Sequence, residues 1–438
     1  MYSRKPFTPK ITVVDAIMGA GKSTWLINYL NKEYACPEAR TPGNAPKRFI
    51  VIVHSLDEVD RFTSSCPALN FKDPQPVHGR KLYGLQELAD EGENIVTTHA
   101  LFKMMTPEVI QSFLSYGYTL MVDEVLSSVE IFNNLSGKDR EMLFGGGYVI
   151  PDEITGRLHW NNNLHADYPS TGRFNDIRKL CEIGSVVLFK KTTLLWEFPS
   201  DFLKAFREIY VFTYLFEGSP MAAYLKSQGF TYETKSISKS MDNLIEISEV
   251  DESELKARLR ELITIYDGPM NNIGTPRDIG QEQPLSATWY KRMTTKITPK
   301  LKSSTENFFK RIASTPAKDN MWTAYKASSK SLKGARYARE WTPVNLKATN
   351  DLIEKKSLAY LCNLFMHPSI RNYFDDRDIK VSDDLYALSE LIQWVWRSQI
   401  RRGDPIYLYI PSQRMRELLI DWLNTESPAN LKTAQQAA

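Results

Sequence analysis

The chain has 438 residues, of which 42% are hydrophobic and 24% are charged, and its formal net charge is +3. This globular composition excludes disordered, collagen-like and mucin-like chains, and the length predicts two large compact units or three smaller ones. The four cysteines form no Cys-x-x-Cys pair, so neither a zinc site nor a disulfide framework is expected. Neither an apolar leader nor a membrane-spanning stretch is visible, so we expect a cytoplasmic protein with no membrane partner.

Short apolar runs alternate with helical patterns through the first 235 residues. Strands are expected at residues 11–16, 49–53, 94–98, 119–122, 186–189 and 209–213. Buried strands of this length, separated by helices, are typical of a mostly parallel sheet that is covered on both faces. The sequence therefore predicts one α/β domain over residues 1–235.

The stretch 145–175 interrupts this alternation. It is rich in glycine, asparagine and proline, which predicts loops and a hairpin inserted after the strand at 119–122. The sequence predicts no role for this stretch.

Residues 16–23, AIMGAGKS, match the phosphate-loop pattern GxxxxGK[ST] except at Ala16. Small residues let the loop amides turn around a phosphate, Lys22 reaches the β and γ phosphates, and the Ser23 hydroxyl binds Mg²⁺. The helix that follows directs its positive N-terminal end to the same phosphates. The nucleotide-binding candidates are Gly19, Ala20, Gly21, Lys22, Ser23 and Thr24.

Residues 120–124, LMVDE, form the second half of a nucleotide site. An apolar strand ends at Asp123, which can hold Mg²⁺ through water, and Glu124 can polarise the attacking water as general base. An apolar strand that ends in acids is a weak signal alone, but it is strong about 100 residues after a phosphate loop. Together the two motifs predict an enzyme that hydrolyses ATP, with ATP and Mg²⁺ at the site.

The order of these motifs resembles that of the superfamily 2 (DEAD/DEAH-box-like) DNA helicases, in particular P-loop ATPases encoded by bacteriophages. Between and after the two motifs come His54-Ser55, the string Thr97-Thr-His-Ala100, and Thr213 at a strand end. The resemblance implies contacts with the nucleic-acid backbone or phosphate at His54, Ser55, Thr98 and His99. It implies that Thr213 couples hydrolysis to strand binding, although the family's Ser-Ala-Thr string is replaced here by Phe212-Thr-Tyr214.

Near the C-terminus, residues 393–403 read QWVWRSQIRRG, which is similar to the sixth helicase motif, QxxGRxxR. Gln393, Arg397 and Arg401 are spaced i, i+4, i+8, so on one helix they share a face and can reach a γ-phosphate across an interdomain cleft. Trp396 stands where the family has glycine, and the last arginine comes one residue late. Either arginine can be the one that neutralises charge in the transition state, and a solvated basic helix is the alternative.

Residues Thr349 and Asn350 resemble the fifth helicase motif, which touches both the strand and the nucleotide. An Asn-Asp pair also caps helices, and a helix is expected at 352–366, so the two readings are equally open. A strand is expected at 406–410.

The segment 285–340 carries a net charge of +10, whereas residues 1–284 carry −7. Basic side chains bind phosphate chains, and aromatic side chains among them stack on the bases of a single strand. The candidates for this nucleic-acid surface are Lys291, Arg292, Lys300, Lys302, Lys310, Arg311 and Trp322. The alternative is a solvated basic face over core aromatics.

These observations favour an α/β protein with a P-loop RecA-like domain over residues 1–235. A second RecA-like domain, degenerate or bearing an insertion, is expected over residues 236–438. We expect a nucleic-acid-dependent ATPase, a DNA helicase or translocase of phage replication or recombination. Its expected partners are single-stranded or forked DNA, more readily than RNA, and replication proteins in the host cytoplasm.

Two other functions are kept open. One is an ATP-gated DNA-binding protein for origin recognition or loading, without unwinding. The other is a small-metabolite kinase, which the length, the basic segment and the Asp123–Glu124 pair disfavour.

Overall fold

The computed structural model describes residues 5–35, 47–237, 243–276, 283–293, 297–345 and 351–426. The chain divides into two compact units, neither of which is one continuous stretch. Unit 1 comprises residues 1–14, 23–234 and 367–381. Unit 2 comprises residues 15–22, 235–366 and 382–438. Thus the glycine loop belongs to unit 2 by its contacts, and the residues after 366 return to unit 1 before the chain ends.

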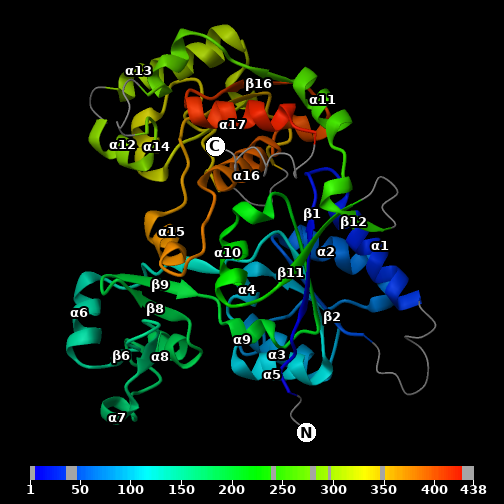
Figure 1. Ribbon diagram of the computed structural model, residues 1–438, viewed down its shortest axis with the longest axis vertical. Helices are drawn as coiled ribbons and strands as arrows, with labels where there is room; N and C mark the ends of the chain where they lie inside the picture. The colour runs from blue at the N-terminus through cyan, green and yellow to red at the C-terminus, as the bar shows by residue number, and fades with distance from the viewer. Residues whose placement is uncertain are drawn as a thin grey trace. The chain divides into compact units, whose positions relative to one another are not determined.

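The larger sheet has seven strands in the order β12-β11-β1-β10-β4-β2-β3. Of these strands, β1, β2, β11 and β12 are labelled in Figure 1. The strands are β1 (Lys10–Asp15), β2 (Phe49–Val53), β3 (Ile95–Thr98), β4 (Thr119–Asp123), β10 (Glu208–Thr213), β11 (Tyr232–Ile237) and β12 (Leu244–Glu246). The pairs β10–β4, β4–β2 and β2–β3 are parallel, and β11–β12 is antiparallel. The expected mostly parallel sheet is therefore confirmed.

Helices follow the parallel strands and enclose the core of unit 1. They are α1 (Lys22–Ala35), α2 (Leu56–Ser65), α3 (Lys81–Glu91), α4 (His99–Phe102), α5 (Pro107–Tyr116), α9 (Ser200–Leu203) and α10 (Pro220–Ser227). Ring contacts from Trp25 to Phe212 and from Tyr29 to Tyr210 pack α1 against β10. Gly117 ends α5 in the left-handed conformation, which lets the chain turn directly into β4.

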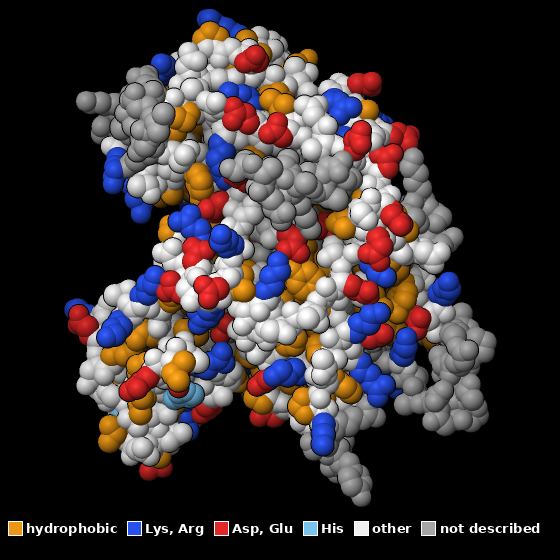
Figure 2. Space-filling model, viewed as in Figure 1, with side chains coloured by type: hydrophobic (Ala, Val, Ile, Leu, Met, Phe, Trp, Pro, Cys, Tyr) orange, Lys and Arg blue, Asp and Glu red, His pale blue; other side chains and the backbone are white. Residues whose placement is uncertain are grey.

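An insert separates β4 from β10. It contains β5 (Val129–Ile131), α6 (Gly137–Gly145), β6 (Val149–Pro151), β7 (Leu158–Trp160), α7 (Asn162–His165), α8 (Asn175–Glu182), β8 (Val186–Phe189) and β9 (Thr193–Glu197). The pair β6–β7 confirms the expected hairpin. Apolar side chains appear on the insert's surface in Figure 2, and Ile154, at the turn of this hairpin, is 95% exposed.

The placement of residues 186–189 in the parallel sheet was wrong. They form β8, which pairs antiparallel with β9 in a separate three-stranded sheet of order β5-β9-β8. Lys190 and Lys191 both have positive φ, at 47° and 59°, and this left-handed pair reverses the chain tightly between the two strands. The Lys-Lys pair lacks the Asn-Gly or Asp-Gly signal of such turns, so the sequence did not reveal the hairpin.

Helix α15 (Pro368–Asp375) packs in unit 1, although it follows most of unit 2 in the chain (Figure 1). Tyr373 and Phe374 lie in the same hydrophobic core as the larger sheet. The Tyr373 hydroxyl donates a hydrogen bond of 2.9 Å to the buried Glu197 carboxylate, and Lys190 pairs with Asp376. These contacts fix α15 to unit 1.

Unit 2 contains a four-stranded parallel sheet in the order β13-β16-β15-β14. The strands are β13 (Ile263–Ile265), β14 (Asn320–Thr323), β15 (Ser357–Tyr360) and β16 (Ile406–Tyr409). Its helices are α11 (Ser253–Leu262), α12 (Ala287–Met293), α13 (Thr298–Asn307), α14 (Lys326–Leu332), α16 (Asp383–Val395) and α17 (Gln413–Asn424). The strand expected at 406–410 is confirmed as β16, and unit 2 is an α/β unit.

The helix expected at 352–366 was wrong. Residues 357–360 form β15, a central strand whose residues are all buried. A strand covered on both faces reads as a continuous apolar run, and the alternation that separates strands from helices is then lost.

Across the described residues, none of the helices combines the length and apolarity needed to cross a bilayer.

Candidate functional site

The glycine loop joins β1, which ends at Asp15, to α1, which begins at Lys22. Gly19 and Gly21 have φ of +83° and +91°, values that side chains disfavour, and the Ala20 amide donates to the Ile17 carbonyl at 3.1 Å. Strand, glycine turn and a 14-residue helix thus occur in the order that a phosphate-binding loop requires. Thr24 is exposed in the first turn of α1.

The Lys22 side chain lies over its own loop. It is only 9% exposed, and its ammonium donates to the carbonyls of Ala16 at 2.5 Å and Ile17 at 3.4 Å. These carbonyls solvate the charge of the buried amine. To bind a phosphate, Lys22 has to exchange this pair of acceptors for phosphate oxygens.

The indole of Trp396 lies directly on the loop. A Cβ built on Gly19 would stand 2.9 Å from Trp396 Cζ2 and 3.7 Å from Cη2. Gly19 is therefore required twice, by its positive φ and by the ring beside it. The sequence marked Trp396 only as a departure from the helicase motif, and its contact with the loop could not be foreseen from that pattern.

The parallel strands of the larger sheet all end at one edge, where the other candidates lie. The register pairs Asp123 of β4 with Phe212 of β10, and Val53 of β2 with Thr98 of β3. Because β10 lies between β1 and β4, Thr213 ends the strand between those of the glycine loop and Asp123. The carboxyl edge of a parallel sheet is where α/β proteins bind ligands.

Two histidines meet at this edge. The rings of His54 and His99 are stacked, with centroids 3.9 Å apart and planes 7° apart, and His99 Nε2 is 2.8 Å from the Asp123 carbonyl oxygen. The two rings thus connect the ends of β2, β3 and β4. Contact of either histidine with nucleic acid stays a prediction.

Ser55 and Thr98 have a structural role as helix caps. The Ser55 hydroxyl accepts from the Glu58 amide at the start of α2, and Glu58 in turn accepts from the His54 amide. Thr98 caps α4 by accepting from the Leu101 amide. This reciprocal capping at α2 satisfies amides that begin a helix. Nucleic-acid contact by the two hydroxyls stays a prediction.

Glu124 has an unusual backbone. Its φ is +70°, in the left-handed region that non-glycine residues rarely adopt, and its amide donates to the Phe212 carbonyl at 2.8 Å. Asp123 beside it is 8% exposed, while Glu124 is half-buried. Strained residues of this kind cluster at functional sites, so the conformation itself marks Glu124 as a functional candidate.

The donors Ser23 and Asp123 fit the chemistry of Mg²⁺. Both offer oxygen atoms, and Mg²⁺ characteristically takes one or two protein oxygens together with phosphate oxygens and water. Ser23 is half-buried in the first turn of α1, and Asp123 ends β4. Both belong to unit 1.

The single helix expected from Gln393 to Arg401 was wrong. Helix α16 ends at Val395, Arg397 follows in a turn, and Arg401 lies in a separate 3₁₀ helix at Gln399–Arg402. The i, i+4, i+8 face therefore does not exist. Gln393 and Arg397 are half-buried, whereas Arg401 is exposed.

The base-stacking role expected for Trp322 was also wrong. Trp322 is 0% exposed in β14, where its ring meets Tyr337 edge-on and its Nε1 donates to the Tyr337 carbonyl. The core of this region also takes up Trp289, Tyr290, Phe308, Phe309 and Tyr337. These aromatic side chains form the hydrophobic core of unit 2. Their spacing among the lysines therefore results from core packing and does not indicate base stacking.

The basic candidates of this segment lie outside that core. Lys291, Arg292, Lys300, Lys310 and Arg311 are exposed, and Lys302 is half-buried. They form a basic surface over the aromatic interior, which is the alternative arrangement kept open from the sequence. Thr349 and Asn350 lie outside the described residues, so their predicted roles stay predictions.

Cavities in the described part of unit 1 were compared with these candidates. One, of about 140 Å³, is lined by His99, Ala100, Phe102, Lys103, Leu126, Ser127 and Phe198. It adjoins the site through His99, but Lys103 in its wall is already paired with Glu130 and lies 4.0 Å from the centre of the Trp196 ring. Its positive charge is therefore already compensated.

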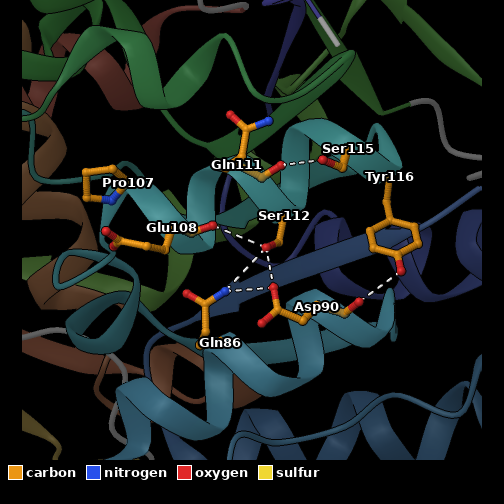
Figure 3. A pocket seen from close by; sticks show the side chains of 8 residues that line it. All are labelled: Gln86, Asp90, Pro107, Glu108, Gln111, Ser112, Ser115 and Tyr116. Atoms are coloured by element: carbon orange, nitrogen blue, oxygen red, sulfur yellow. Dashed lines mark hydrogen bonds between the residues drawn. The ribbon is translucent and has the colours of Figure 1, made fainter. Parts of the chain in front are cut away.

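A second cavity, of about 440 Å³, lies between α3 and α5 (Figure 3). Its polar groups bond to one another, as Ser112 and Gln86 both do to the Asp90 carboxylate. The site candidates from the sequence are not among its lining residues, which are Gln86, Asp90, Pro107, Glu108, Gln111, Ser112, Ser115 and Tyr116. We therefore place the candidate site at the sheet edge.

Fold and site define an α/β protein with two largely parallel sheets and a glycine loop after the first strand. Family models match two stretches: the YonV middle domain at residues 129–196 and the YonV C-terminal Rossmann-like domain at residues 257–423. The SPbeta prophage-derived uncharacterized protein YonV of Bacillus subtilis (strain 168) is 35% identical over 430 residues, covering 95% of this chain and 99% of that protein. The chain therefore belongs to the YonV family.

The two family matches follow the architecture. The middle-domain match coincides with the insert from β5 to β9, and the C-terminal match runs from α11 to α17. A solved chain titled XPD_APO is similar over 94% of this chain and 96% of that chain, with 10% identity and a TM-score of 0.46.

Proposed function

We propose that this protein is a phage-encoded, nucleic-acid-dependent ATPase of the superfamily 2 type, acting as a DNA helicase or translocase in replication or recombination. The observation that carries the proposal is the carboxyl edge of the larger sheet. There the glycine loop follows β1, and the strained Glu124 follows β4, with β10 between the two strands. Phage origin is supported by the prophage-derived relative. A RecA-like fold of both units is part of the proposal.

Each residue has a chemical role in this proposal. Lys22 leaves the Ala16 and Ile17 carbonyls to bind the β and γ phosphates. Asp123 and Ser23 would hold Mg²⁺, which would neutralise phosphate charge when bound. Glu124 takes the proton of the attacking water as general base.

Arg397 is the arginine that we assign to the transition state. It is adjacent to Trp396, whose ring rests on Gly19, and both belong to unit 2 together with the loop. Arg401 is exposed in the next 3₁₀ helix. An arginine that neutralises charge in the transition state acts at the γ-phosphate. We therefore choose Arg397, because its neighbour Trp396 contacts the phosphate-binding loop.

The test is steady-state ATP hydrolysis by the full chain, with and without single-stranded DNA. We expect DNA to stimulate hydrolysis severalfold. Lys22→Ala should abolish the activity, whereas Lys32→Ala, an exposed lysine in the last turn of the same helix, should not. Hydrolysis that persists in Lys22→Ala, or does not occur in the wild type, would refute the ATPase.

An ATP-gated DNA-binding protein without unwinding is the second candidate. It is favoured by the burial of Trp322 and its neighbours, because the exposed side chains of the basic segment then suit the phosphate backbone better than unstacked bases. Tight ATP-dependent DNA binding without strand displacement would support it. Strand displacement in the same preparation would exclude it.

A further inference from the structure

Trp396 lies against the glycine loop and directly precedes the candidate arginine in the chain. Its indole edge lies so close to Gly19 that a methyl group there would stand 2.9 Å from Cζ2. The next residue in the chain is Arg397, which is half-buried. One side chain thus contacts the loop while its neighbour carries the charge assigned to catalysis.

The turn that carries Trp396 is held firmly within unit 2. The amides of Trp396, Arg397 and Ser398 bond to carbonyls of residues 392, 394 and 395, and the Ser398 hydroxyl also donates to the Val395 carbonyl at 2.7 Å. The indole and Arg397 are therefore joined through a short, bonded stretch of backbone.

Both ends of this turn are anchored. Before it, the fully buried Trp394 donates from Nε1 to the Thr342 hydroxyl at 2.9 Å and meets the Tyr360 ring edge-on. After it, the Gln399 amide donates to the Lys355 carbonyl at 3.1 Å. The turn has few ways to move alone, so its contact with the loop defines where the loop lies relative to Arg397.

The loop side of the contact has to change when a phosphate binds. Lys22 then gives up the carbonyls of Ala16 and Ile17, which are two to three residues before Gly19. Release of these carbonyls alters the short stretch of backbone on which the indole rests. The indole is therefore placed to sense whether the loop holds a phosphate.

We propose that Trp396 is a positioning residue that couples the glycine loop to Arg397 through the packing of its indole on Gly19. This inference rests on the proposed ATPase and adds a residue that the helicase motif does not contain. It explains why an aromatic side chain stands where the motif has glycine. Trp396 acts on the reaction through Arg397 and does not itself take part in chemistry.

Kinetics of five variants test the coupling. We expect Trp396→Ala to lower the kcat of DNA-stimulated hydrolysis about tenfold or more while the KM for ATP changes less than about threefold. Trp396→Phe keeps a ring on Gly19 and should recover activity to within about threefold of the wild type. The double variant Trp396→Ala/Arg397→Ala should be no slower than Arg397→Ala alone, since both act through the same step. Arg402→Ala, which breaks a surface pair with Glu354, is the control and should stay at the wild-type rate.

Fluorescence supplies a readout that a purely structural role would not move. A non-hydrolysable ATP analogue with Mg²⁺ should change the tryptophan emission of the wild type. That change should fall by more than about half in Trp396→Phe and persist in Trp160→Phe, a tryptophan of the β6–β7 hairpin.

The outcomes separate the two proposals. If the wild type binds no nucleotide, the proposed ATPase fails. If the wild type binds and hydrolyses ATP but Trp396→Ala matches its rate, or the double variant shows additive losses, the coupling through Trp396 is overturned. Unchanged emission in the wild type on analogue binding would also overturn it.

Discussion

At the scale of single residues, the structure places conformational demands on the candidate site that a motif does not express. Gly19 needs a positive φ and an open side for the Trp396 ring. Glu124 holds a positive φ with a full side chain. Position 19 therefore requires glycine. At position 124 the backbone strain lowers the stability of the fold at the proposed general base.

Gly19→Ala should destabilise the protein by about 1–2 kcal/mol through backbone strain. The added methyl group also forces the Trp396 ring to shift, which should destabilise the protein further. Gly229→Ala is a matched control, because Gly229 has a φ of +73° and nothing within 4 Å of its Cβ position. Urea unfolding of both variants measures the difference. Equal destabilisation of the two variants would show that the Trp396 ring beside Gly19 adds nothing to the free-energy cost of the substitution.

Glu124→Gly should stabilise the fold by about 1 kcal/mol relative to Glu124→Gln, because glycine relieves the left-handed strain that glutamine retains. Both variants should lose hydrolysis by about 100-fold or more, as expected on removing a general base. Thermal unfolding and ATPase assays in parallel measure the two effects. A glutamine variant as stable as the glycine variant would contradict the strain.

At the scale of elements, helix α15 is held by a buried polar network. The Glu197 carboxylate is 1% exposed, and it accepts from Tyr373, Gln228 and Arg157, each at 2.9 Å. A buried carboxylate persists only when its oxygens are bonded in this way. Loss of one partner should therefore cost more than an exposed ion pair would.

Glu197→Gln tests this network through its pH dependence. Burial raises the pKa of Glu197, and Tyr373, Arg157 and Arg377 oppose the shift without cancelling it. A folded-state pKa above the unfolded value stabilises the fold at low pH, and this contribution is lost as the pH rises through the raised pKa. Glutamine does not titrate, so the stability of the variant relative to the wild type should rise with pH over that window. Denaturant unfolding at several pH values measures it, and the opposite trend would refute the raised pKa.

Several elements could be predicted from the sequence because local pattern and packing agree there. Strand β2 lies at residues 49–53 as expected, and β3, β4, β10 and β16 differ from expectation by two residues at most. Each contains consecutive apolar residues. The glycine loop was recognisable because its chemistry restricts both residue type and order.

The elements that could not be predicted depend on tertiary contacts. Residues 186–189 are as apolar as the parallel strands, and only the left-handed Lys190–Lys191 turn directs them into an antiparallel sheet. Helix α16 stops at Val395 although its helical pattern continues to Arg401, because bonds of Arg397 and Ser398 to residues three back tighten the chain. Trp322 was predicted to stack on bases because the sequence alone does not distinguish a buried tryptophan from an exposed one.

At the scale of the whole molecule, positive charge is concentrated in one segment of a nearly neutral chain. The basic surface of residues 285–340 lies over an aromatic core, and its cations include Lys300, Lys310 and Arg311, all exposed. Exposed cations bind the phosphate backbone irrespective of sequence, with a strong dependence on salt. This surface is the part of the protein on which nucleic-acid binding should depend most.

Replacing Lys300, Lys310 and Arg311 together by alanine should weaken binding to DNA of any sequence. The slope of log affinity against log salt should fall by up to about 2–3, because each phosphate that is no longer neutralised lowers it by about 0.7–0.9. Lys138→Ala, an exposed lysine of the insert, is the control. Binding titrations at several salt concentrations measure it, and an unchanged slope would place the nucleic-acid surface elsewhere.

The return of α15 to unit 1 has a consequence for the order in which the chain is made. The core of unit 1 contains Tyr373 and Phe374, which leave the ribosome only after the strands β13, β14 and β15 of the other unit. Until then Glu197 lacks the hydroxyl that Tyr373 supplies. The core of unit 1 therefore stays incomplete until residues 373 and 374 have been synthesised. A chain truncated after residue 234 would lack these two core residues.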